Sequence, residues 1–111
     1  MIQITERPNG MTLVRIDDAR LTAAIAPDFK QRMADAVEAG HNRLVLDLSR
    51  VTFIDSTGLG ALVGVLKRIG NRGDLAVCGL QPAVQQMFKL TRMDRVFRIF
   101  PDAETAIASL Q

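Results

Sequence analysis

The stretch of sequence that decides the fold is LVLDLSRVTFIDSTGLG, residues 44–60. It begins as an apolar strand, and after a short turn Ser56 stands where a helix must begin. A serine at that point can cap the helix by accepting a hydrogen bond from a backbone N–H group. Its hydroxyl can also face solvent or a partner, where a phosphate would add a charge of about −1.5 to −2. The rest of the sequence helps to distinguish these two roles.

Chain length and composition indicate one small folded domain. The chain has 111 residues, of which 48% are hydrophobic, and this is enough for one ordinary core. We therefore expect a single domain over residues 1–111. The formal net charge is only +2, and basic residues are spread among acidic ones, so we expect no nucleic-acid binding.

Cysteine content and hydropathy predict a cytoplasmic protein. A lone cysteine, Cys78, cannot form an internal disulfide, and the first residues lack the pattern of a secretory signal. The longest weakly polar stretch, residues 59–66, is far shorter than the roughly 20 apolar residues that span a bilayer. We expect no membrane insertion.

Hydrophobic periodicity predicts the element order β-β-α-β-α-β-α-β-α. The expected elements are a hairpin around Pro8-Asn9-Gly10, a helix from Pro27 to Gly40, a strand at 43–48, a helix at 57–69, a strand at 75–79, a helix from Pro82, a strand at 96–100 and a helix from Pro101-Asp102. Alternating strands and helices predict an α/β fold with a mixed, mostly parallel sheet, edged by the hairpin and flanked by four helices.

The helix after Ser56 has two different faces. Its core face is formed by Leu59, Leu62, Leu66 and Ile69. Its opposite face carries Thr57, Gly60, Gly64, Lys67 and Arg68, with Ser56 at the N-terminal edge. Glycines on an exposed helix face destabilise it by about 1 kcal/mol each relative to alanine. Either another surface approaches this backbone closely, or the helix packs closely against a neighbouring element of its own domain; the sequence leaves both open.

A phosphate on Ser56 would experience two opposing local effects. The free N–H groups at the helix start would stabilise it, and the carboxylate of Asp55 would repel it. Because the two effects partly cancel, we expect phosphorylation to leave the fold intact. Its main consequence would then fall on a partner surface lying over Gly60 and Gly64.

The motif around Ser56 resembles the signature of STAS domains of the anti-anti-sigma factor type. The resemblance is carried by D-S-T-G-L-G at residues 55–60, by Asp47-Leu48 before it, and by residues 73–79, 82–84 and 87–91 after it. It covers essentially the whole chain, and the spacing of every element fits. The resemblance implies a STAS fold.

The family also implies a function in bacterial partner switching. An unmodified domain binds an anti-sigma factor, often a serine kinase, and the kinase then phosphorylates the serine that corresponds to Ser56, which releases the domain. A serine phosphatase restores binding. The resemblance implies no catalysis and no cofactor. The residues expected at the partner surface are Asp55, Ser56, Thr57, Gly58, Gly60, Gly64, Lys67 and Thr22.

Two positions depart from the family pattern. Family members commonly carry an aspartate where this chain has Thr22, close to the phosphorylation site, which changes the charge available to a docking kinase. Glycine is common where Arg92 stands. An alternative function with the same fold is a STAS subunit of a lipid-transport or stress-signalling assembly that works without a phosphorylation cycle.

Enzyme motifs fail on spacing. Two residues separate Asp55 from Gly58, so the D-[ST]-G triplet of aspartic proteases is absent, and Ile54 breaks the G-x-S-x-G pattern of serine hydrolases. Neither metal-ligand spacing nor a phosphate-binding loop of the G-x-x-x-x-G-K type occurs.

Four further residues have expectations of their own. The only histidine, His41, is expected in a solvated loop, and Cys78 is expected to be buried and inert. Asp47 either hydrogen-bonds the turn that follows its strand or helps to line the surface around Ser56, and we favour the first. Thr57 is expected in the first turn of the helix rather than as a second phosphate acceptor.

Overall fold

The computed structural model describes residues 2–111, so Met1, the first residue of the expected domain, lies outside the described residues. The strands are β1 (Ile2–Arg7), β2 (Met11–Ile16), β3 (Arg20–Leu21), β4 (Arg43–Asp47), β5 (Phe53–Ile54), β6 (Asp74–Cys78) and β7 (Arg98–Phe100). The α-helices are α1 (Ala26–Glu38), α2 (Ser56–Ile69), α3 (Pro82–Leu90) and α4 (Ala103–Leu110). Three short 3₁₀ turns are η1 (Pro8–Gly10), η2 (Gly70–Arg72) and η3 (Met93–Arg95).

Five strands form the main sheet in the order β1-β2-β4-β6-β7. β1 and β2 pair antiparallel, and every other pair in this sheet is parallel. The hairpin turns through Asn9 and Gly10, whose φ angles are 67° and 77°, as the Asn-Gly signal predicts. The expected α/β class, with a mixed, mostly parallel sheet and a hairpin at its edge, is confirmed.

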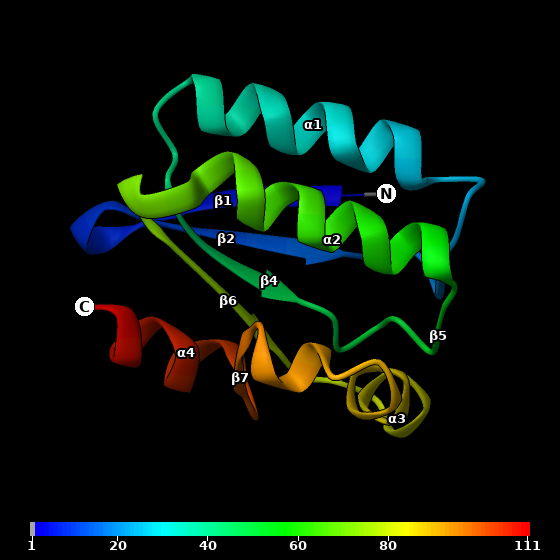
Figure 1. Ribbon diagram of the computed structural model, residues 1–111. Coiled ribbons are helices and arrows are strands. Elements are labelled where there is room, and N and C mark those ends of the chain that lie inside the picture. Colours follow the sequence, from blue (N-terminus) through cyan, green and yellow to red (C-terminus); the bar gives the residue numbers. More distant parts are fainter. Residues whose placement is uncertain (1) are drawn as a thin grey trace.

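The two faces of the sheet support different hydrophobic clusters. Leu44 and Leu46 of β4 point into the main cluster beneath α1 and α2, whereas Val45 between them joins a smaller cluster with Ala106 and Ile107 of α4. This alternation follows from the two-residue period of a strand. Figure 1 shows α1 and α2 on one side of the sheet and α4 on the other. The layers place the start of α2 at the carboxyl ends of the strands.

The segment before β7 differs from the expected strand at 96–100. Val96 and Phe97 both donate backbone hydrogen bonds to the carbonyl of Met93, at 3.0 Å each, so the chain is still turning there. The Phe97 side chain is buried and packs against Phe88 of α3, with ring centroids 5.7 Å apart. The strand therefore begins two residues later, at Arg98, because Phe97 fills the core from a turn.

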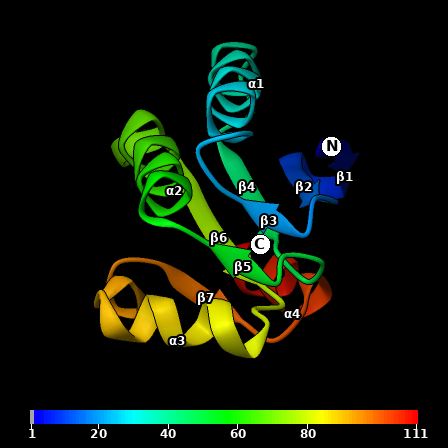
Figure 2. The same cartoon turned by 90° about the vertical axis from the view of Figure 1, so that its right-hand side faces the viewer.

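A second sheet of two short strands was not expected. Arg20 and Leu21 of β3 pair in parallel with Phe53 and Ile54 of β5. Figure 2 shows this small sheet next to the start of α2. Two-residue strands carry no periodicity, so only the folded chain brings these segments together.

Candidate functional site

Asp55, rather than Ser56, is the N-cap of α2. The Asp55 backbone is extended, and its Oδ1 accepts a hydrogen bond of 2.7 Å from the backbone N–H of Gly58. Ser56 is the first residue of the helix. Of the two roles that the sequence allowed for Ser56, capping is therefore excluded, because the preceding carboxylate already caps the helix.

The same carboxylate fixes the loop that leads into α1. Asp55 Oδ2 accepts a hydrogen bond of 3.2 Å from the backbone N–H of Ala23, the residue after Thr22. The Asp55 N–H donates to the carbonyl of Leu21 at 3.3 Å. Thr22 is half-buried. No sequence pattern predicted that the Ala23 amide would bind Asp55. Asp55 thus joins two segments that lie more than 30 residues apart in the chain.

Ser56 and Thr57 are both exposed on the first turn of α2. Within residues 2–111, the Ser56 hydroxyl has no hydrogen-bond partner. Since Asp55 already accepts from the Gly58 N–H, that amide is not free to bind a phosphate on Ser56. The Ser56 hydroxyl is accessible for modification, and its surroundings are set by Asp55.

Gly58 lies beneath the surface rather than on it. It is buried, and a Cβ at this position would come within 2.1 Å of the carbonyl oxygen of Leu21. Only glycine permits this approach between α2 and β3. Gly58 therefore supports the site from inside, and the structure corrects its expected place on the partner surface.

Gly60 and Gly64 behave in the opposite way. Both are exposed, and a Cβ added at either position would meet no atom within 4 Å. Packing against a neighbouring element of the domain is therefore not the reason for these glycines. Of the two explanations that the sequence left open, approach by another surface remains.

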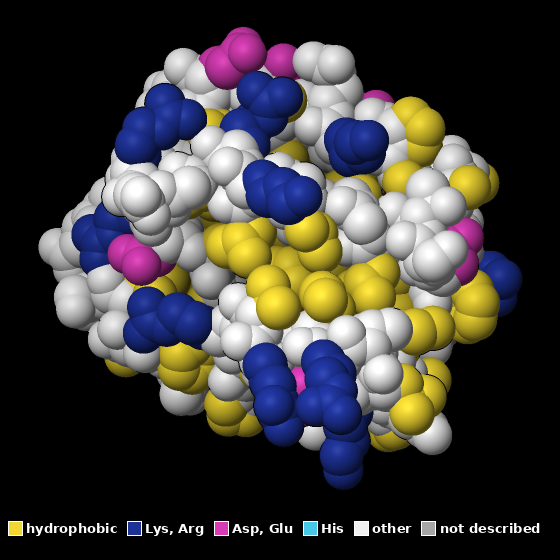
Figure 3. Space-filling view, viewed as in Figure 1, with side chains coloured by type: hydrophobic (Ala, Val, Ile, Leu, Met, Phe, Trp, Pro, Cys, Tyr) yellow, Lys and Arg dark blue, Asp and Glu magenta, His cyan; other side chains and the backbone are white. Residues whose placement is uncertain are grey.

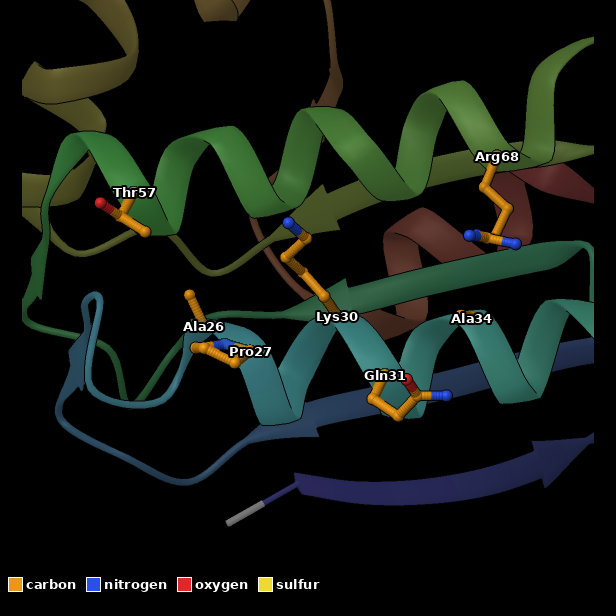
Figure 4. Close-up of a pocket in the computed structure, with 7 residues that line it drawn as sticks. All are labelled: Ala26, Pro27, Lys30, Gln31, Ala34, Thr57 and Arg68. Atoms are coloured by element: carbon orange, nitrogen blue, oxygen red, sulfur yellow. The ribbon is translucent and has the colours of Figure 1, made fainter.

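A groove lies between α1 and α2, beside the glycines. It has a volume of about 390 Å³ and is lined by Ala26, Pro27, Lys30, Gln31, Ala34, Thr57 and Arg68. Figure 4 shows Lys30 on α1 and Arg68 on α2 at the groove, with Thr57 at the end where α2 starts. Both cations are exposed, and Arg68 lies 3.9 Å from Glu38. Lys30 was not among the expected site residues, because helical periodicity does not reveal which helix lies beside α2.

The remaining side chains have structural roles away from Ser56. Asp47 Oδ1 accepts a 2.9 Å hydrogen bond from the backbone N–H of Ser49, so it holds the turn after β4 as favoured. Cys78 is buried, and desolvation, reinforced by the nearby carboxylates, raises the pKa of its thiol to about 12. The expected burial of Cys78 is confirmed, and the inertness of its thiol stays a prediction.

His41 lies in the loop before β4, as expected, but its side chain is only partly exposed to solvent. It is half-buried, its Nδ1 lies 3.2 Å from the Thr12 hydroxyl, and its Nε2 lies 3.5 Å from a carboxylate oxygen of Glu6. His41 precedes β4, whereas Ser56 follows the carboxyl end of that strand and of β5. The histidine and the serine therefore lie at opposite ends of the domain.

Residues 2–111 contain no group of three or more His, Cys, Asp or Glu side chains arranged to hold a metal ion. Among the described helices, none combines the length and hydrophobicity needed to cross a membrane.

The start of α2 thus combines an exposed serine, an unobstructed glycine face and a capping carboxylate. The sequence matches the STAS domain over residues 2–106, so the chain belongs to the STAS-domain family.

Several similar proteins are named as anti-sigma factor antagonists. The sequence is 30% identical to BtrV of Bordetella bronchiseptica, a candidate anti-sigma factor antagonist, over 96% of this chain and 91% of the relative. The fold matches that of a candidate anti-sigma factor antagonist from Thermotoga maritima with a TM-score of 0.87, at 27% identity, covering 98% of this chain and 93% of the other. SpoIIAA, a Bacillus cell fate determinant solved in its phosphorylated form, shares the fold with a TM-score of 0.76 at 16% identity, over the full length of both chains.

Proposed function

We propose that this protein is an anti-anti-sigma factor controlled by phosphorylation of Ser56. In its unmodified form it binds an anti-sigma factor that is also a serine kinase, in the bacterial cytoplasm. Phosphorylation of Ser56 by that kinase releases it, and a serine phosphatase restores binding. The observation that carries this proposal is the exposed, unpartnered Ser56 hydroxyl at the end of an unobstructed glycine face.

Local geometry supports a phosphate on Ser56 that acts on a partner surface rather than on the fold of the domain. Asp55 keeps its hydrogen bonds to Gly58 and Ala23, so a phosphate on Ser56 would lie next to a fixed negative charge and would not replace the cap. Like-charge repulsion disfavours a phosphate turned toward Asp55. The phosphate would instead face whatever covers Gly60 and Gly64, and the fold would stay intact.

The exposed face supplies the contact area for the partner. Gly60 and Gly64 let a partner backbone approach the helix, and Thr57 and Lys67 border them. Thr22 lies beside the same end of α2, through the hydrogen bond between Ala23 and Asp55. Gly58 takes part only indirectly, by seating α2 against Leu21.

A binding role fits this site better than catalysis. A serine nucleophile needs a nearby general base, and the histidine of this chain lies at the far end of β4. The hydrogen bonds of Asp55 are structural, since both of its carboxylate oxygens accept from backbone amides.

The test is incubation of the protein with the cognate anti-sigma kinase and ATP, followed by phosphosite mapping with mass spectrometry. We expect modification at Ser56 that disappears in Ser56→Ala and persists in the matched control Thr57→Ala. In binding assays we expect that the Ser56→Asp variant no longer binds the kinase. Unimpaired binding by Ser56→Asp would contradict the switch and favour a STAS subunit that works without a phosphorylation cycle.

A second pair of variants tests the glycine face separately. Gly64→Ala adds one methyl group to open space and should weaken partner binding while the domain stays folded. Ala39→Gly, at the exposed C-terminal end of α1, is a control change of the same size outside the face. Equal partner affinity of Gly64→Ala and the unmodified protein would remove the glycine face from the interface.

A further inference from the structure

A second exposed surface lies on the α3 side of α2. Figure 3 shows hydrophobic side chains gathered between α2 and the end of α3, above a cluster of Lys and Arg side chains. The hydrophobic residues that these elements expose are Val63 and Leu66 of α2, Met87 and Leu90 of α3, Met93 of η3, and Val96 after it. We call these six residues the α2–η3 surface.

The α2–η3 surface is more apolar than folding of the domain requires. Val63, Leu66, Met87 and Met93 pack against the main core but remain partly exposed. Leu90 and Val96 are 74% and 46% exposed. Gathered hydrophobic side chains of this kind, bordered by polar residues, mark interaction sites.

Positive charges outnumber negative ones around this surface. Lys67 of α2, Lys89 of α3, and Arg92 and Arg95 at η3 are all exposed. In residues 2–111, the side chains of these four cations make no ion pair or hydrogen bond, whereas Arg7, Arg15, Arg50, Arg68 and Arg98 all lie near carboxylates. The only carboxylate within η3 is that of Asp94. A partner that binds this surface therefore has to carry negatively charged groups.

We propose that the α2–η3 surface is a docking site for an acidic amphipathic helix of a protein partner. The apolar side of such a helix would cover Val63, Leu66 and Met93, and its acidic side would meet the four cations. A second copy of this chain is disfavoured, because it would place the same cations against one another. A bilayer is disfavoured because four of the six hydrophobic side chains are partly buried and present little area for insertion.

Position along α2 links this surface to Ser56. Ser56, Gly60, Val63 and Lys67 follow one another at helical spacings of four, three and four, so they form one row on the helix. If Ser56 is phosphorylated, which rests on the function proposed above, its negative charge lies at one end of the acidic helix's path. Like-charge repulsion would then weaken docking of the same partner.

The test titrates isotopically labelled, unmodified protein with a synthetic probe in NMR. The probe is a helical peptide of about five turns, with leucine along one face and glutamate along the other; the control peptide carries lysine in place of glutamate. We expect amide shifts at the α2–η3 surface, with a dissociation constant of about 1 mM or tighter. The lysine peptide should bind at least about tenfold more weakly.

Charge variants test the α2–η3 surface in unmodified protein, so the result does not depend on phosphorylation of Ser56. Lys89→Glu/Arg95→Glu should weaken the glutamate peptide at least about tenfold, and Arg92→Gly should weaken it without loss of folding. The double control Arg32→Glu/Arg50→Glu makes the same change in net charge outside the surface and should bind normally. Equal binding of both peptides, shifts located elsewhere, or equal weakening by the control would overturn the proposal. So would tighter binding to phosphatidylglycerol vesicles, or self-association that Lys89→Glu/Arg95→Glu abolishes.

Discussion

The same substitution, glycine to alanine, should have opposite effects at three positions of one helix. At Gly58 the new Cβ would lie 2.1 Å from the carbonyl oxygen of Leu21 and 2.9 Å from its carbonyl carbon. These are backbone atoms, so no side chain can rotate away. α2 and β3 must separate by about 1.3 Å or more to reach the 3.4 Å of ordinary van der Waals contact. At Gly60 and Gly64 the added methyl group meets nothing within 4 Å.

The expected magnitudes follow from these contacts. Overpacking of this kind lowers the free energy of unfolding by about 1–3 kcal/mol. Separation also breaks the hydrogen bond between the Asp55 N–H and Leu21, which contributes about 1 kcal/mol. Gly58→Ala should therefore lose about 2–4 kcal/mol, or about 10–20 °C in Tm for a domain of this size. Gly60→Ala and Gly64→Ala should each gain up to about 1 kcal/mol from helix propensity.

Urea unfolding of the three variants, followed by circular dichroism, measures this difference. The unmodified protein is the reference, and Ala39→Gly reports the penalty for glycine at an exposed helix end. A Gly58→Ala variant as stable as the reference would refute the close approach of α2 to β3. Destabilisation by Gly60→Ala or Gly64→Ala would show that these positions are not open.

Three further predictions concern single residues. Arg92 has a φ of 62°, in the left-handed region that strains an arginine backbone. Arg92→Gly should therefore raise the free energy of unfolding by about 1 kcal/mol, measured by urea titration. An unchanged or lower free energy of unfolding would contradict backbone strain at Arg92. Because burial raises the pKa of Cys78 to about 12, the native thiol should resist an aromatic disulfide reagent at pH 8 and react once the chain unfolds; rapid reaction of the folded protein would refute this. Hydrogen bonds from the backbone N–H and the side chain of Thr105 lower the pKa of Asp102 below its ordinary value. The ionised carboxylate therefore stabilises the fold above about pH 4. This stabilisation disappears as the pH falls through the lowered pKa. Asp102→Asn should flatten that part of the pH–stability curve, and an unchanged curve would exclude the cap as its source.

Arg92 occupies a backbone position at which glycine is physically favoured. The resemblance to STAS domains led us to expect glycine at this position, and here an arginine adopts the backbone conformation that glycine accepts most readily. The same arginine belongs to the cations beside the α2–η3 surface.

Sequence alone determined the elements that have strong local signals. The 3.6-residue period of α2, the Asn-Gly hairpin and the apolar strands β4 and β6 were all predicted, because each depends on residues near one another in the chain. The exposure of Ser56, Thr57, Gly60, Gly64 and Lys67 also followed from that period. The motif around Ser56 was sufficient for the family.

Only the tertiary structure showed that residues of the same type have different roles. Gly58 is buried against Leu21 of β3, whereas no atom of residues 2–111 lies within 4 Å of a Cβ added at Gly60. Asp55 caps the helix and holds Ala23, a contact that exists only once β3 and β5 pair. His41 contacts Thr12 and Glu6 because β4 pairs with β2, which in turn pairs with β1. Local sequence patterns predict which residues are helical or apolar, but contacts between distant segments depend on how the layers pack, and those contacts set the role of each residue at the start of α2.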